Sequence, residues 1–133
     1  MKTSQIGLFI VRVVVGITFM LHGLDKFQTG IGNIAGWFDS VGLPGFLAYI
    51  IAVIELVGGI AMILGIGTRI VGGLFALVMV GAIVTVKLPA GFLGGFELDV
   101  ILLAVSIQLA MSGSSIFSLD QVLTRSKELG FKA

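Results

Sequence analysis

The chain lacks cysteine altogether and has a single histidine, His22, among its 133 residues. The absence of cysteine excludes disulfides, iron–sulfur clusters and thiolate metal sites, and one histidine excludes a haem held by two histidines of the same chain. We therefore expect no metal site and no intrinsic cofactor. Any electron transfer would need a bound organic cofactor, a lipid-soluble compound such as a quinone, or a partner protein.

Charged residues are also scarce, at 11% of the sequence, whereas 57% of the residues are hydrophobic. The mean hydropathy is +1.18. A water-soluble protein of this size could not build a hydrated surface from so few charges, so we expect one integral-membrane domain over residues 1–133 in contact with the lipid bilayer. The formal net charge of +1 comes from scattered residues. No nucleic-acid partner is therefore expected.

Long apolar runs predict an all-α fold, a bundle of four transmembrane helices. Arg12 interrupts the first run, and no small-residue cleavage site follows it, so we interpret that run as a retained helix rather than a signal peptide. The purely apolar part of the last run is too short to cross about 30 Å of hydrocarbon, so either Glu97 and Asp99 enter the membrane or the helix continues past Met111. The expected spans are about residues 6–26, 46–66, 69–87 and 96–114.

Two shorter helices are expected outside the four spans. The first loop, residues 28–45, carries apolar residues at spacings of three and four together with Trp37, which predicts a short interfacial helix, either a simple anchor or a functional lid. After the fourth span, Ser118 and Gln121 resemble a capping box. They predict a short amphipathic helix over residues 119–129.

The distribution of lysine and arginine predicts the orientation in the membrane. One side of the bundle holds most of the basic residues, and the opposite side holds only Lys26 and Lys87. We therefore expect both termini in the cytoplasm and His22 towards the outer side. The basic residues on the expected cytoplasmic side are Lys2, Arg69, Arg125, Lys127 and Lys132.

Glu55 is the only charged residue of the second span, and a charge near the bilayer centre costs at least about 2.5–3.5 kcal/mol. Counted from the ends of the apolar runs, Arg12 and Glu55 lie at depths of roughly 9 and 14 Å. We therefore predict a buried Arg12–Glu55 ion pair, which fixes the packing of the helices or, alternatively, serves as a proton or substrate site. Both residues lie on helical stripes of small residues that permit close packing: Arg12, Gly16, Phe19, Gly23 and Lys26, and Ala48, Ala52, Glu55, Gly59 and Met62.

A second polar group is expected nearer the outer face. His22 and Lys26 are four residues apart on one side of the first helix, at the level of Glu97 and Asp99 on the fourth. An imidazole and an ammonium group facing carboxylates can hydrogen-bond to the oxygens of a quinone or catechol and exchange protons. The same groups could instead bridge the helices. His22, Lys26 and Glu97 are the catalytic candidates, and Asp99 is a secondary one.

Several motifs in order make the chain resemble the DoxX family of small four-helix membrane proteins, and within it the CatD-like oxidoreductase branch. Phe96 departs from the pattern, because many relatives have a tyrosine there. The motifs are Arg12-x3-Gly16-x5-His22-Gly23-x2-Lys26-Phe27, Glu55-x2-Gly58-Gly59-x5-Gly65-x2-Thr68-Arg69, Gly94-Gly95-Phe96-Glu97-Leu98 and Phe117-Ser118-Leu119-Asp120.

The resemblance implies a multi-pass protein of the bacterial plasma membrane, linked to oxidoreductase systems such as quinone or catechol detoxification. It adds Arg69 to the polar residues of interest. Three hypotheses follow. The chain is a component of such an oxidoreductase system, a non-catalytic scaffold that recruits a soluble redox partner through its cytoplasmic termini, or a small proton-coupled exporter that uses Glu55. The exporter would require a homo-oligomer, because four helices leave little room for alternating access.

Overall fold

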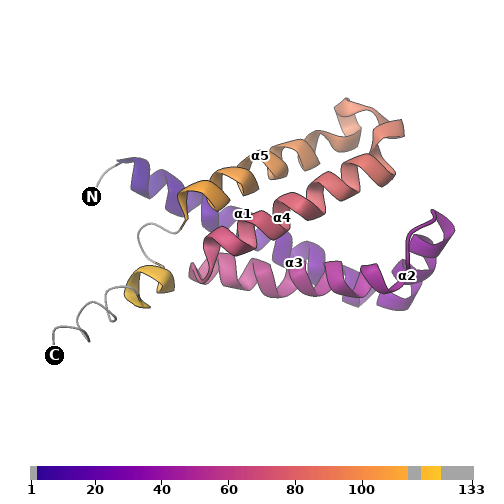
Figure 1. The fold of residues 1–133 in the computed structure, drawn as a ribbon, viewed down its shortest axis with the longest axis horizontal. Helices are drawn as coiled ribbons and strands as arrows, with labels where there is room; N and C mark the ends of the chain where they lie inside the picture. Colours follow the sequence, from indigo (N-terminus) through magenta and orange to yellow (C-terminus); the bar gives the residue numbers. More distant parts are fainter. Residues whose placement is uncertain (1–2, 114–117, 124–133) are drawn as a thin grey trace.

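Four long helices form the body of the computed structural model, which describes residues 3–113 and 118–123 (Figure 1). Within those residues there are no strands. Together with the turns that extend α4 and α5, the four helices are long and apolar enough to cross a membrane, so the chain is a multi-pass membrane protein. Their bounds are α1 Thr3–Thr29, α3 Phe46–Leu64, α4 Thr68–Ala82 and α5 Glu97–Ser112, which confirms the predicted four-helix bundle.

Glycines bring the helices together in two close pairs, α1 with α3 and α4 with α5. A Cβ atom placed on Gly59 of α3 would lie 2.5 Å from the backbone nitrogen of Met20 on α1. A Cβ on Gly72 of α4 would lie 2.8 Å from the backbone nitrogen of Ala110 on α5. Small residues allow this approach because the helix backbones themselves touch, which is how helices commonly pack in lipid.

The two pairs are joined at one end and separate towards the other. A short turn links α3 to α4 through Gly65 and Gly67, whose φ angles of 75° and 58° are left-handed and suit glycine. From this turn the α4/α5 pair leans away from the α1/α3 pair, towards the end of the bundle that carries α2 (Figure 1). We call this far end the α2 end.

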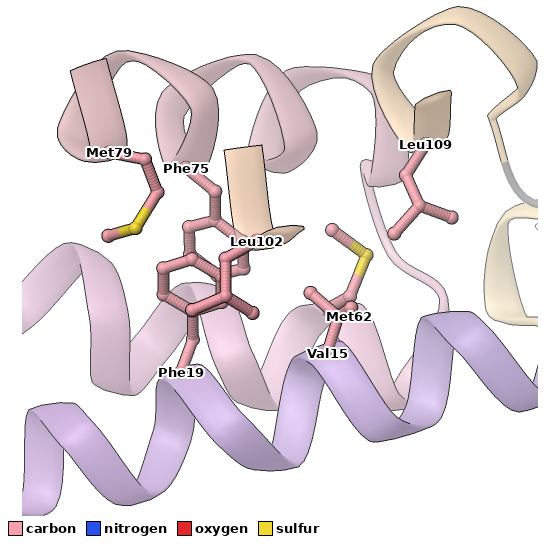
Figure 2. Close-up of a cluster of buried hydrophobic side chains, with 7 residues drawn as sticks. All are labelled: Val15, Phe19, Met62, Phe75, Met79, Leu102 and Leu109. Carbon is pink, nitrogen blue, oxygen red and sulfur yellow. The ribbon is translucent and has the colours of Figure 1, made fainter. Parts of the chain in front are cut away.

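An apolar core fills the space between the pairs near the middle of the bundle (Figure 2). At its centre Phe19 of α1 stacks on Phe75 of α4, with ring centroids 3.8 Å apart and an interplanar angle of 13°. Because this stack joins one helix pair to the other, it closes the space between the pairs on the side away from the α2 end. Its neighbours in the cluster are Val15, Met62, Met79, Leu102 and Leu109.

The α2 end is closed by short elements. Helix α2 (Ile31–Ser40) lies in the first loop, as predicted, with Phe38 buried and Trp37 half exposed beside it. On the other pair, α4 continues into a wider π-helical turn, η1 (Ile83–Lys87). The short turns η2 (Leu88–Ala90) and η3 (Phe92–Phe96) then lead into α5.

The segment after α5 returns to the α3–α4 turn. The Ser118 hydroxyl accepts a hydrogen bond from the backbone N–H of Gln121 at 3.2 Å, and residues 119–123 are helical. This confirms the start of the predicted C-terminal helix, whose remainder, 124–129, lies outside the described residues. The Asp120 carboxylate accepts hydrogen bonds from the N–H groups of Gly67, at 2.8 Å, and Thr68, at 3.2 Å. Asp120 therefore caps α4 from a distant part of the sequence.

Replacing Asp120 with alanine is expected to destabilise the protein by about 2 kcal/mol, because a helix cap is lost and a nearby arginine loses a counter-charge. The free energy of unfolding can be measured by titration with SDS, followed by circular dichroism. Asp25→Ala is the matched control, since Asp25 is exposed and its one hydrogen bond within the described residues is a 3.5 Å contact with Thr29. Equal stability of the two variants would contradict the capping role.

Candidate functional site

A cavity of about 580 Å³ lies between the two helix pairs at the α2 end. We call it the wedge cavity. Helices α1 and α3 form one wall, α4 and α5 form the other, and α2 covers the end. Its lining residues are Phe19, His22, Lys26, Trp37, Phe38, Leu43, Leu47, Ile50, Ile51, Ile54, Glu55, Leu77, Val78, Met79, Gly81, Ala82, Thr85, Lys87, Leu98, Asp99 and Leu102.

The floor and the cover of the wedge cavity are apolar. Phe19, held by its stack on Phe75, forms the floor together with the buried side chain of Met79. At the opposite end the rings of Trp37 and Phe38 lie 5.7 Å apart in an edge-on arrangement. Such an apolar lining lowers the local dielectric constant and strengthens the electrostatic interactions of the few charged groups in the cavity.

Lys26 and Glu55 form an ion pair in the α1/α3 wall. Lys26 Nζ donates a hydrogen bond to Glu55 Oε1 at 2.7 Å, and the two side chains are 22% and 4% exposed. The small residues of the two stripes place the side chains in reach, because they let α1 and α3 approach closely. The ammonium group offsets the cost of burying a carboxylate inside a membrane span.

A second ion pair lies in the α4/α5 wall. Lys87 Nζ, in η1, lies 3.4 Å from both Oδ1 and Oδ2 of Asp99 on α5. Asp99 is buried, whereas Lys87 remains partly exposed. Each helix pair thus contributes one lysine–carboxylate pair to an otherwise largely apolar cavity.

His22 lies one helical turn before Lys26 and also lines the wedge cavity. Its side chain is exposed, so it stands at the rim rather than in the floor. The structure therefore brings the predicted candidates His22 and Lys26 together at one cavity, and adds Glu55 and Asp99 to them. Within the described residues no group of three or more histidine and carboxylate side chains is gathered closely enough to hold a metal ion.

The structure does not bring Arg12 and Glu55 together, although the sequence predicted that they form an ion pair. Glu55 contacts Lys26 instead. Arg12 is buried at the other end of the bundle, beside the α3–α4 turn at Gly65. There it interacts electrostatically with Asp120 and lies over the ring of Phe9, so its role belongs to the packing of that end.

The predicted pairing was wrong because the ends of α1 and α3 do not lie at the same levels in the bundle. Helix α1 is 27 residues long and extends beyond its predicted span at both ends. The close contact of Gly16 with Gly59 sets the register of the two antiparallel helices. Arg12, one turn before Gly16, therefore reaches the end of α3, while Glu55, one turn before Gly59, lies near the level of His22.

Glu97 and Arg69 also lie outside the wedge cavity. Glu97 Oε1 accepts a hydrogen bond from the N–H of Gly94 at 3.1 Å, which holds the bend between η3 and α5. Arg69 donates hydrogen bonds to the carbonyl oxygens of Met111, at 2.9 Å, and Ser112, at 3.4 Å. It therefore satisfies the end of α5, as cations near helix C-termini commonly do.

Lys87 was not among the predicted site residues, although a signal for it was present. It is the only basic residue between Arg69 and Arg125, and it precedes Pro89 at the expected outer boundary, the level of Asp99. A single cation between two long apolar helices, at the level expected for Glu97 and Asp99, indicates that it pairs with one of these two carboxylates.

Comparisons with known proteins identify relatives over nearly the whole chain. The DoxX family model matches residues 7–88. The chain is 50% identical over 129 residues to "Putative oxidoreductase CatD" of Bacillus subtilis, which covers 97% of this chain and 96% of that protein. It is 35% identical over 130 residues to the uncharacterized membrane protein Rv3486 of Mycobacterium tuberculosis, covering 86% and 80% of the two chains. The inner membrane protein YqjF of Escherichia coli is 29% identical over 68 residues, about half of each chain. No solved structure matches.

Proposed function

This chain belongs to the DoxX family, and we propose that it is the membrane component of an oxidoreductase system, binding a quinone- or catechol-like ring in the wedge cavity. One observation carries the proposal. A largely apolar cavity of about 580 Å³ holds two lysine–carboxylate pairs, Lys26 with Glu55 and Lys87 with Asp99. Small-molecule sites commonly have volumes of about 300–1,000 Å³, mostly apolar walls and a few convergent polar groups.

The polar groups match the oxygens of such a ring. The ammonium groups of Lys26 and Lys87 donate hydrogen bonds to quinone carbonyl oxygens, and the carboxylates of Glu55 and Asp99 accept them from the hydroxyls of a catechol or quinol. Reduction of a quinone to a quinol takes up two electrons and two protons. We assign the electrons to a separate soluble redox partner, and the positioning and protonation of the ring oxygens to the cavity.

The cavity supports ring binding over a purely scaffolding role. A scaffold needs no space beside His22, and a densely packed interior would serve it better. The pairing of Glu55 with Lys26 likewise gives the exporter hypothesis less support, since the coupling carboxylate already has a cationic partner. The name of the Bacillus subtilis relative agrees with a redox role.

Trp37 provides a direct test, because it is the only tryptophan of the chain and lines the wedge cavity. In lipid nanodiscs, menadione is expected to quench Trp37 fluorescence saturably, and catechol is expected to displace the menadione. Ala82→Phe adds a ring to the cavity wall without changing any charge, and should weaken menadione binding at least tenfold. Gly73→Phe is the matched control, since a side chain at Gly73 on the same helix would point into open space and Gly73 does not line the cavity.

The proposal fails if quenching is linear in menadione concentration, as it is for collisions in the bilayer. It also fails if Ala82→Phe and Gly73→Phe reduce binding equally. Circular dichroism and gel filtration establish that each variant is folded before binding is compared.

A further inference from the structure

The wedge cavity opens sideways between α3 and α4. The two helices contact each other where Phe75 fills the space beside Gly58, since a Cβ on Gly58 would lie 2.8 Å from the Phe75 ring. Further towards the α2 end they diverge (Figure 1). A Cβ on Gly81 would meet nothing within 4 Å. The α3–α4 side of the cavity is therefore open at the level of Gly81.

Apolar side chains line this opening on both sides. Ile50 and Ile54 lie on one face of α3, and Leu77, Val78 and Gly81 lie on the facing side of α4. Ile50 is 47% exposed and Leu77 is 70% exposed, although both also line the cavity. We call these five residues the lateral slot.

The slot lies within membrane-spanning helices. Ile50 and Ile54 are four and eight residues from the start of α3, which corresponds to about 6 and 12 Å along the helix. The exposed sides of Ile50 and Leu77 therefore face lipid. Glu55, paired with Lys26, follows directly after Ile54, so the slot runs from the lipid to a charged pair inside the cavity.

We propose that the lateral slot admits a ring that carries a long apolar tail, so that the ligand is a membrane-dissolved isoprenoid quinone or quinol. The inference rests on the proposed ring-binding function and names its substrate class. The ring oxygens lie against the lysine–carboxylate pairs, while the tail passes between Ile50 and Gly81 into the bilayer. A small water-soluble ring would need no opening at this depth.

The tail gains little affinity from the slot itself. Its methylene groups leave a lipid environment for one that is equally apolar, so the usual gain of about 0.8 kcal/mol per buried CH₂ group does not apply. The slot instead removes the need to fold the tail into a cavity of about 580 Å³. Expressed per mole fraction in the membrane, ring affinity should therefore be similar with and without the tail.

The test compares two naphthoquinones in nanodiscs by quenching of Trp37, menadione and the same ring with a four-unit isoprenoid tail. Gly81→Phe narrows the slot and is expected to weaken binding of the tailed quinone at least tenfold more than it weakens binding of menadione. Gly81→Leu should give a smaller loss. Gly73→Phe is the matched control, because Gly73 is equally free of neighbours on α4 but lies outside the slot.

The other outcomes overturn the inference or the proposed function separately. Equal weakening of both quinones by Gly81→Phe, or weakening of neither, rejects the slot while ring binding stands. A change of oligomeric state in Gly81→Phe, detected by cross-linking in nanodiscs, would identify the slot as an interface between two copies of the chain. It would reject the proposal that a quinone tail passes through the slot. If neither quinone binds the unaltered protein, the proposed function itself fails.

Discussion

Lys26→Met is expected to destabilise the protein by about 3–5 kcal/mol, the usual cost of leaving one member of a buried ion pair without its partner. Glu55 is 4% exposed and lies inside a membrane span, so without the ammonium group it must be protonated or rearrange. The reciprocal change should cost less, because Lys26 is 22% exposed and can turn its ammonium group towards the membrane surface. We expect Glu55→Gln to cost about 1–2 kcal/mol, since the amide oxygen still accepts a hydrogen bond.

The double variant Lys26→Met with Glu55→Gln should recover most of the lost stability, because no buried charge remains unpaired. The measurement is a double-mutant cycle on the free energy of unfolding in SDS, followed by circular dichroism. A coupling energy below about 0.5 kcal/mol would contradict the pair, as expected for residues that do not interact.

The same double variant separates an architectural role of the pair from a binding role. If the pair only fixes the packing of α1 against α3, the restored protein should bind menadione as the unaltered protein does. The proposed function requires instead that binding stays at least tenfold weaker, because the ring loses both a donor, Lys26, and an acceptor, Glu55. Trp37 fluorescence reports the difference.

The faces on which α1 and α3 pack could be predicted from the sequence, because small residues recur there at helical spacing. Every residue of the predicted α3 stripe is buried, and so are the first four residues of the α1 stripe. Hydropathy likewise predicted the four long helices and the short helix in the first loop. These features depend on local periodicity and length, which a single sequence contains.

Which side chain of α1 pairs with Glu55 of α3 could not be predicted in the same way. A stripe of small residues permits close contact at several registers. Sliding α1 along α3 by one turn, about 5.4 Å, gives every residue a different partner on the facing helix. The choice of Lys26 over Arg12 as the partner of Glu55 depends on the contact between Gly16 and Gly59. That contact is a property of the assembled pair of helices.

A local bend of the chain determines which of the two carboxylates, Glu97 or Asp99, faces the cavity. Two residues apart on a helix, the two carboxylates point in directions that differ by about 200°, so only one of them can face the cavity. Gly94, with φ of 71°, bends the chain at η3 and presents its N–H to Glu97. Asp99 is thereby directed to Lys87. The apolar residues of α5 are spread around its whole circumference, so the sequence pattern did not indicate which face lines the cavity.

Gly59→Ala is expected to destabilise the bundle by about 2–3 kcal/mol, although it adds a single methyl group. The new Cβ would lie 2.5 Å from the backbone nitrogen of Met20 and 2.6 Å from the carbonyl oxygen of Gly16. Backbone atoms of a helix cannot move aside as the end of a flexible side chain can, so α1 and α3 must separate. Gly23→Ala should have a similar effect, because its Cβ would lie 2.5 Å from the backbone nitrogen of Leu56.

Separation of α1 from α3 should also weaken the site, because the same contact sets the 2.7 Å distance between Lys26 and Glu55. Gly59→Ala is therefore expected to lower both the free energy of unfolding in SDS and the affinity for menadione. The matched control is Gly73→Ala, at a position with no neighbour within 4 Å, which should stay within about 0.5 kcal/mol of the unaltered protein. If Gly59→Ala were as stable as this control, the α1/α3 contact would be looser than described, and the stripes of small residues would not be what holds the ion pair in place.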